Sequence, residues 1–206
     1  MTENETGTTL KQGLVIPAMP LALTENREFD ERHQRGLLRY YMDAGAGGVA
    51  AGVHTTQFEI RRHPALFEHV LTVAAEEIDR FVAAGGKSVV KIGGVLGKRD
   101  QALQEAQLLN KIGYDAGLVS LTAFKGAGID EIIDHCRIVS EEIPIIGFYL
   151  QPAVGGIELP YEFWRRFVEI PSVLAVKVAP FNRYKTIVVV RGLPESGRQE
   201  QVARYT

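Results

Sequence analysis

The 206-residue sequence has little of several features that mark whole classes of protein. It has a single cysteine, Cys136, which excludes a disulfide scaffold and favours a reducing compartment. Its formal net charge is only -2, whereas a nucleic-acid-binding domain is expected to be basic. No apolar run approaches the roughly 18 to 20 residues of a membrane-spanning helix. These absences predict a globular, cytoplasmic protein that binds neither nucleic acid nor membrane.

The start of the chain is polar and lacks the apolar core of a signal peptide. We therefore expect residues 1–12 to be a disordered lead-in. Residues 13–206 are expected to form one domain, although length alone also admits two small ones.

Short apolar runs alternate with longer amphipathic segments along almost the whole chain. The apolar runs predict strands at 14–16, 48–51, 88–92, 116–121, 145–149 and 173–178. The amphipathic segments predict helices at about 30–44, 65–84, 100–111, 129–142 and 160–168. Further helical material is expected at 184–191 and 195–205.

Successive strand-helix units without a hairpin signal predict an α/β protein with a parallel sheet that is covered on both faces. Two architectures fit this pattern, an open doubly wound sheet and a closed (β/α)8 barrel. Successive strand starts lie roughly 28 to 41 residues apart, and such barrels typically take about 250 residues. Eight units would therefore need more chain than is present.

Both architectures place ligands at the carboxyl ends of the strands, where Lys177 is the most anomalous residue. It lies in the otherwise apolar run Val173–Ala179, and strand alternation places it on one face with Val173 and Ala175. Burial without a carboxylate partner lowers the pKa of an amine, as a lysine that forms a Schiff base requires. The alternative is a lysine that extends from the strand end into solvent.

Lys91 and Tyr149 are further candidates at strand ends. Lys91 is followed by two glycines that permit close approach of a ligand, but a lysine that reaches solvent is the alternative. Tyr149 closes the run 145–149, and its phenol can donate or accept a proton. Plain packing is the alternative for this aromatic side chain.

A polar loop follows the run 48–51 and contains Gly52, His54, Thr55 and Thr56. Hydroxyl and backbone N–H groups in such a glycine-led turn can hold a carboxylate or a phosphate. The alternative is an ordinary loop in which the threonine hydroxyls bond to their own backbone.

Several familiar motifs are absent. The segment Gly93–Lys98 has one residue too few for a phosphate-binding loop, and Arg99 replaces the Ser or Thr that would hold magnesium. None of the five histidines lies in a His-Glu-x-x-His arrangement, and no Gly-x-Ser-x-Gly elbow occurs. No Gly-x-Gly-x-x-Gly follows the first strand, so a nucleotide-binding domain is a weak alternative. The sequence predicts no metal and no cofactor.

Residues at the ends of the fifth and sixth predicted strands resemble the dihydrodipicolinate synthase and N-acetylneuraminate lyase family, and two glycine-containing runs near the start are similar to it as well. These residues are Tyr149, Pro152, Gly156 and Lys177, with the runs Gly13–Ala18 and Gly45–Val49. The resemblance covers residues 13–206. It implies a (β/α)8 TIM barrel, here with about six of the eight strand-helix units.

The resemblance also implies a class I aldolase or hydro-lyase that binds pyruvate or another 2-oxo acid as a Schiff base. Lys177 would then form the imine, and Tyr149 would carry protons to and from it. Lys91 becomes less plausible as the reactive amine. Such proteins are commonly tetrameric, so we expect a homo-oligomer, either a dimer or a tetramer.

This sequence departs from the family pattern at residues that contact substrate. The family's hydroxyl pair follows its glycine directly, whereas Val53 and His54 intervene here before Thr55. Val154 stands where synthases of the lysine pathway place an arginine, so dihydrodipicolinate synthesis itself is not expected. Phe124 stands in place of a tyrosine that one subunit lends to its neighbour. These changes favour a less charged, more apolar acceptor.

The chain ends where a seventh strand is expected to begin. An open sheet of six strands would expose two edges and an apolar interior. The rival to a lyase is therefore a catalytically impaired or noncatalytic barrel homologue that serves ligand binding or assembly.

Overall fold

The computed structural model describes residues 1–206 and contains six strands and seven α-helices. The strands are β1 (Gly48–Ala51), β2 (Val90–Val95), β3 (Ala116–Val119), β4 (Ile145–Leu150), β5 (Val173–Ala179) and β6 (Ala203–Tyr205). The α-helices are α1 (Glu3–Lys11), α2 (Glu31–Asp43), α3 (Pro64–Ala83), α4 (Arg99–Ile112), α5 (Ile129–Glu142), α6 (Tyr161–Phe167) and α7 (Arg183–Glu195). Short 3-10 helices follow β1, β3 and β4, namely η1 (His54–Thr56), η2 (Phe58–Arg62), η3 (Thr122–Phe124) and η4 (Pro152–Val154).

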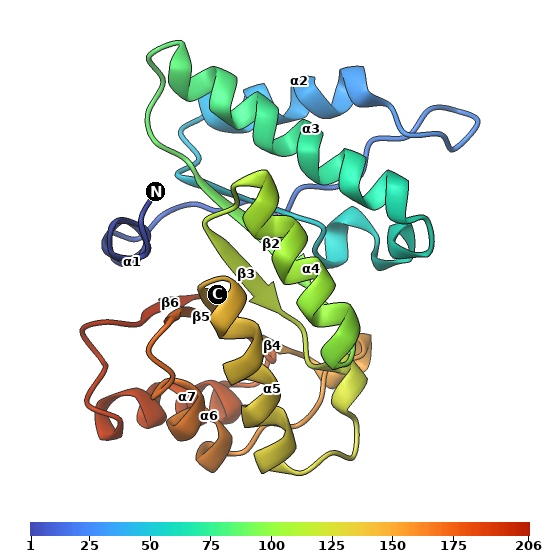
Figure 1. The fold of residues 1–206 in the computed structure, drawn as a ribbon. Helices are drawn as coiled ribbons and strands as arrows, with labels where there is room; N and C mark the ends of the chain where they lie inside the picture. Colours follow the sequence, from blue (N-terminus) through green and yellow to red (C-terminus); the bar gives the residue numbers. More distant parts are fainter.

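The strands pair in chain order from β1 to β6, and every pair is parallel. A doubly wound sheet reverses its strand order at a switch point, and no reversal occurs here. Helices α2 to α7 pack against one another in chain order along the outside of the sheet (Figure 1). The fold is therefore a half-barrel of parallel strands, and the doubly wound alternative is wrong.

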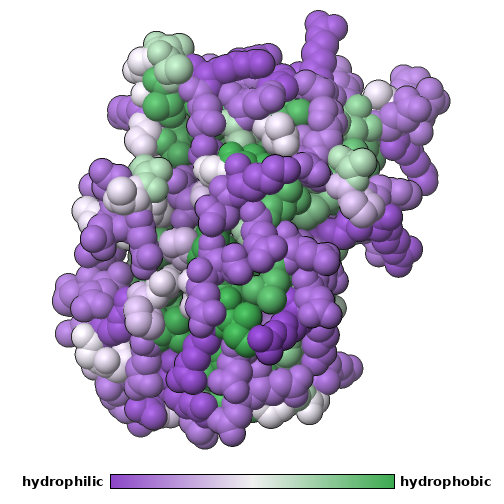
Figure 2. Space-filling view, viewed as in Figure 1, coloured by the Kyte–Doolittle hydropathy of each residue, from purple (hydrophilic) through white to green (hydrophobic).

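Buried apolar side chains form two clusters, one on each face of the sheet. The outer cluster of 40 residues fills the space beneath helices α2 to α7, and the inner cluster has only 12 residues. Phe163, Trp164 and Phe167 of α6 are each 1% exposed, which confirms the apolar face predicted for this helix. Figure 2 shows that the outer surfaces of the helices are mostly hydrophilic. None of the helices is long and apolar enough to cross a membrane.

The first predicted strand, 14–16, does not form a strand of the sheet. An extended segment lies beside β1 instead, where Gly47 N–H donates to Val15 O and Ala50 N–H donates to Pro17 O, both at 3.0 Å. Only one isolated bridge, between Ala18 and Ala50, joins them. Proline has no N–H to donate to a ladder, so the pairing cannot extend regularly through Pro17.

The end of the chain also differs from expectation. Residues 195–205 were expected to be helical, yet β6 forms at Ala203–Tyr205 and pairs with β5. Val202 and Ala203 are buried, and Tyr205 stands opposite Lys177. The free edge of β5 thus supplies backbone partners that the local sequence does not reveal.

Helix α1, Glu3–Lys11, lies within residues 1–12, where a disordered lead-in was expected. Thr2 and Glu5 make a capping box, which satisfies the first free N–H groups of the helix. Leu10, at 1% exposed, belongs to the inner cluster, and α1 packs against β5 and β6. Because only one apolar side chain anchors the helix, its local sequence carries little amphipathic signal.

The pairing of β4 with β5 contains a shift of register. Ile145 pairs with Val173, but the next residue, Ile146, pairs with Ala175, so Leu174 is an extra residue in β5. Val173 consequently belongs to the outer cluster and Ala175 to the inner one. The prediction that Val173 and Lys177 share one face is therefore wrong.

We expect Leu10→Ala to lower the free energy of unfolding by about 2–5 kcal/mol, because it leaves a cavity between α1 and the inner face of the sheet. Urea titration followed by circular dichroism measures the change. Lys11→Ala, at the adjacent exposed position, is the matched control. Equal stability of the two variants would contradict the packing of α1 described above.

Candidate functional site

A cavity of about 340 Å3 lies on the inner face of the sheet, and Lys177 has the only charged side chain in its lining. The lining comes from β1 to β6 and from the extended segment beside β1. It consists of Leu14, Val15, Ile16, Ala50, Ile92, Leu118, Ile146, Lys177, Tyr205 and Thr206. A largely apolar hollow with few polar groups is the usual form of a small-molecule site.

The amine of Lys177 is held without a carboxylate partner. Burial alone lowers its pKa, since desolvation disfavours the ammonium form. Its Nζ lies 4.8 Å from the ring centroid of Phe148, a cation–π contact that only partly replaces lost hydration. The arrangement raises the fraction of neutral, nucleophilic amine at a given pH.

Lys177 lies at the carboxyl rim of the sheet. Val95, Val119, Gly147 and Val176 form one row of paired residues across four strands. Val95 and Val119 end their strands, so Lys177 is one residue beyond the ends of β2 and β3. The carboxyl rim is the face on which barrels of this architecture carry their reactive groups.

The ring of Tyr149 lies on the other side of the sheet from this cavity. It belongs to the outer cluster, is 1% exposed, and its centroid is 5.1 Å from that of Trp164. Burial raises the pKa of its phenol, which stays protonated at neutral pH. The structure therefore places Tyr149 and Lys177 on neighbouring strands, but it brings Phe148, not Tyr149, against the amine.

Lys91 does not face the cavity. Its Nζ donates to Asp79 Oδ1 at 2.7 Å, and its side chain is 12% exposed. This hydrogen bond directs the amine toward α3, and Lys91 is absent from the lining of the cavity. Lys91 is thus an ion-paired lysine between the sheet and α3.

The predicted binding residues in the loop after β1 differ in their exposure to solvent. Thr56 is fully buried, and its hydroxyl donates to Met19 O. Thr55 and His54 are exposed. Gly52 turns the chain with a φ of +66°, a conformation that residues with a side chain rarely adopt. Thr55 and His54 therefore remain available to a ligand, whereas Thr56 anchors the loop.

Val154 and Phe124 occupy different environments. Val154 lies in η4 and is 42% exposed. Phe124 is 3% exposed, and its ring contacts the Lys98 ammonium at 4.1 Å and the His135 ring at 4.4 Å. Phe124 therefore packs within its own subunit.

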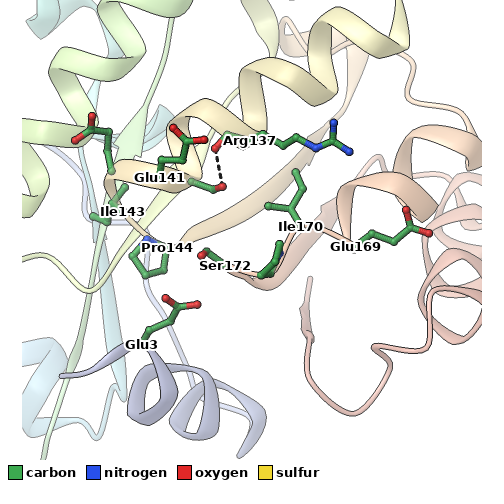
Figure 3. A pocket seen from close by; sticks show the side chains of 11 residues that line it. Glu3, Arg137, Glu141, Ile143, Pro144, Glu169, Ile170 and Ser172 are labelled. Carbon is green, nitrogen blue, oxygen red and sulfur yellow. Dashed lines mark hydrogen bonds between the residues drawn. The ribbon is translucent and has the colours of Figure 1, made fainter.

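A larger hollow of about 590 Å3 lies at the opposite end of the sheet, where β4 and β5 begin (Figure 3). Its lining is mainly polar and includes the carboxylates of Glu3, Glu141 and Glu169. The amino ends of barrel strands serve stability more than chemistry. Because Lys177 is at the other rim, this hollow is not the candidate site.

The remaining reactive side chains give no second centre. Burial raises the pKa of the Cys136 thiol to about 12, so it is not a nucleophile at neutral pH. No group of three or more His, Cys, Asp or Glu side chains is placed to hold a metal ion.

Sequence analysis did not single out Phe148, Arg61 or Glu105. Phe148 reaches Lys177 only because of the register shift, which no local pattern signals. Arg61 Nε donates to Glu105 Oε1 at 2.9 Å, and both side chains are 8% exposed. These two residues are 44 positions apart and form no recognised motif.

The proteins to which this chain is similar include the following three. The 4-hydroxy-tetrahydrodipicolinate synthase of Desulforudis audaxviator is 25% identical over 189 residues, which are 91% of this chain and 62% of the relative. A prophage protein of the dihydrodipicolinic acid synthase family from E. coli K12, solved with pyruvate, superposes with a TM-score of 0.78 at 15% identity, over 92% of this chain and 62% of its own. The N-acetylneuraminate lyase of Fusobacterium nucleatum superposes with a TM-score of 0.72 at 18% identity. The superposition covers 91% of this chain and 62% of the lyase chain.

The chain spans about 62% of the length of these relatives. The two solved structures, at this level of identity, establish the fold, namely that of a partial TIM barrel. Residues 11–195 match the Dihydrodipicolinate synthetase family, which is most of the chain. The protein therefore belongs to the dihydrodipicolinate synthetase family.

Proposed function

We propose that the protein is a lyase of the dihydrodipicolinate synthase and N-acetylneuraminate lyase type that acts on a 2-oxo acid through a Schiff base on Lys177. The observation that carries the proposal is a partly buried amine of lowered pKa at the carboxyl rim of a half-barrel. Family membership supports it, since named members of the family are lyases.

The proposed chemistry begins with attack of the neutral Lys177 amine on the 2-oxo carbonyl. Loss of one water molecule gives an imine, and its protonated form withdraws electrons from the adjacent carbon. Departure of a proton or a carbon substituent from that carbon leaves an enamine, which takes up a proton or an acceptor carbon to restore the imine. Hydrolysis by one water molecule then releases the acid and the free Lys177 amine. A cavity lined mainly by Leu, Ile, Val and Ala side chains restricts water near the imine.

Tyr149 is the second member of the proposed pair. It is the next-to-last residue of β4, the strand beside β5, and its phenol holds a proton at neutral pH. Its ring lies against Trp164, so proton transfer requires the ring to swing from the outer cluster toward the rim. The role therefore depends on a movement of the loop that follows β4.

The acceptor is proposed from the positions that differ from lysine-pathway synthases. Val154 provides no cation for a second carboxylate, and Phe124 provides no hydroxyl to a neighbouring subunit. These residues favour a less charged acceptor. The Desulforudis relative is a 4-hydroxy-tetrahydrodipicolinate synthase, so that synthesis is the alternative, and product analysis with pyruvate and an aldehyde acceptor distinguishes the two.

A noncatalytic homologue is the second candidate, and one arrangement favours it. Tyr149 and Thr56 are both committed to internal contacts, with Trp164 and with Met19. In that case the cavity would bind a 2-oxo acid without turning it over.

Assembly into a dimer or tetramer is also proposed. Tyr184, Ile187 and Val190 recur every third residue of α7 and are 66%, 55% and 41% exposed. Phe181, just before the helix, is 84% exposed. An apolar stripe of this kind is typical of a surface that another chain covers.

Reduction with sodium borohydride in the presence of pyruvate is expected to attach the three-carbon acid to Lys177, because borohydride converts an imine into a stable secondary amine. Peptide mass spectrometry locates the adduct. Lys177→Ala should abolish it, and Lys91→Ala, which removes an ion-paired lysine from the same sheet, should leave it intact. An adduct on Lys91, or none on the wild type, would refute the assignment.

Tyr149→Phe is expected to slow exchange of the pyruvate methyl protons with deuterium by about 10²–10⁴-fold, the usual contribution of a positioned acid/base. Proton NMR in deuterated water follows the exchange, and borohydride trapping at Lys177 should persist. Tyr40→Phe, on the exposed face of α2, is the control. Unchanged exchange in Tyr149→Phe would assign the phenol to packing alone.

The reactivity of Lys177 toward an acylating reagent is expected to rise with pH through a midpoint below 10.5, because burial favours the neutral amine. Only the neutral form reacts, so reactivity is low below that midpoint and reaches a plateau above it. Competitive labelling with acetic anhydride measures this curve, with exposed Lys11 as the internal reference. A midpoint at or above 10.5 would contradict the burial described here.

A further inference from the structure

A buried ion pair joins two segments at the carboxyl rim. Arg61 lies in η2, in the connection after β1, and Glu105 lies in α4, after β2. Arg61 Nε donates to both carboxylate oxygens of Glu105, at 2.9 and 3.0 Å. Each side chain is only 8% exposed, so water screens the pair weakly.

The pair also holds the end of β2. Arg61 Nη2 donates to Gly94 O at 3.0 Å, and Glu105 accepts from Leu96 N–H at 3.0 Å. Gln101 Nε2 donates to Glu105 Oε1 at 2.8 Å. One arginine and one glutamate thus tie the loop after β1, the end of β2 and the first turns of α4 into a single unit.

Stability alone does not account for this pair. Burial lowers the pKa of Arg61, and its Nη1 is buried with no hydrogen-bond partner in the chain. Apolar residues of similar volume often replace a buried ion pair with no loss of stability. A buried pair whose Arg61 Nη1 has no partner in the chain is better explained by the geometry that it imposes.

The segment that the pair holds is the loop Gly52–Gln57. Gln57 has a φ of +70°, which is uncommon for a residue with a side chain and persists only where surrounding contacts enforce it. The Thr56 hydroxyl fixes the middle of the loop to Met19 O. Arg61, four residues beyond Gln57, fixes the C-terminal end of the loop through its hydrogen bond to Gly94 O. Thr55 stays exposed in the loop.

We propose that Arg61, held by Glu105, is a positioning residue that sets the Gly52–Gln57 loop to receive the carboxylate of the 2-oxo acid that Lys177 attacks. Arg61 does not line the cavity of Lys177, so it acts through the loop and not by touching the reacting atoms. The inference rests on the proposed Schiff-base function and adds the residue that determines affinity for the acid.

Borohydride trapping at increasing pyruvate concentration tests this role in the full chain. Arg61→Lys keeps the charge but loses the forked contacts to Glu105 and Gly94 O. Glu105→Gln keeps an oxygen for Leu96 N–H but removes the counter-charge of Arg61. Each variant should raise the half-saturating pyruvate concentration about 10–100-fold, as expected for a misplaced binding loop, with an unchanged maximum of adduct on Lys177.

Arg62→Lys is the matched control, since Arg62 is 78% exposed and pairs only with Glu59. Its half-saturating concentration should equal that of the wild type. An unchanged half-saturation in folded Arg61→Lys and Glu105→Gln would overturn the proposal. So would a lower maximum of adduct at an unchanged half-saturation, because the pair would then support Lys177 and not the loop.

Folding of the variants is checked by thermal unfolding under circular dichroism. If Arg61→Lys does not fold, Glu105→Gln carries the same comparison, and failure of both to fold assigns the pair to stability and overturns the positioning role. If the wild type itself forms no adduct, the proposed function fails first. That result is distinguishable, because it is read without any Arg61 or Glu105 variant.

Discussion

The pairing of β4 with β5 determines where the candidate reactive groups lie. Had the pairing of Ile145 with Val173 continued without a shift, Tyr149 would stand opposite Lys177, and both side chains would lie on the outer face with Ile145 and Val173. The extra residue in β5 instead turns Lys177 to the inner face, opposite Phe148, while Tyr149 stays on the side of the helices. A displacement of one residue in a strand moves every later side chain to the opposite face, so the chemistry available to Lys177 depends on this shift.

Two lysines in similar apolar strands show how partners decide function. Lys91 Nζ donates to Asp79 Oδ1 at 2.7 Å, which ties this amine to α3. Lys177 has no carboxylate partner, its Nζ lies 4.8 Å from the ring centroid of Phe148, and burial lowers its pKa. The same residue type is thus an ion-paired residue between the sheet and α3 in β2 and a candidate nucleophile in β5. Neighbouring elements, not the strand sequences, create this difference.

The central elements were predictable because their signals are local. Apolar periodicity located α5 at Ile129–Glu142 and β4 within one residue, and Asp30 caps α2 as expected. The two ends of the chain were not predictable in this way. Helix α1 depends on Leu10 entering the inner cluster, and β6 depends on the free edge of β5. Both are stabilised by distant partners that carry no signal in the adjacent sequence.

The sequence by itself determined that the chain alternates strands and helices, that its parallel strands end in polar loops, and that Lys177 is an unusual residue in an apolar strand. Only the tertiary structure decided the sequential strand order, the face on which Tyr149 lies, and the contact of Arg61 with Glu105. The physical reason is the distance along the sequence over which each effect operates. A periodic pattern of apolar residues depends on residues a few positions apart, whereas strand register and buried ion pairs join residues tens of positions apart.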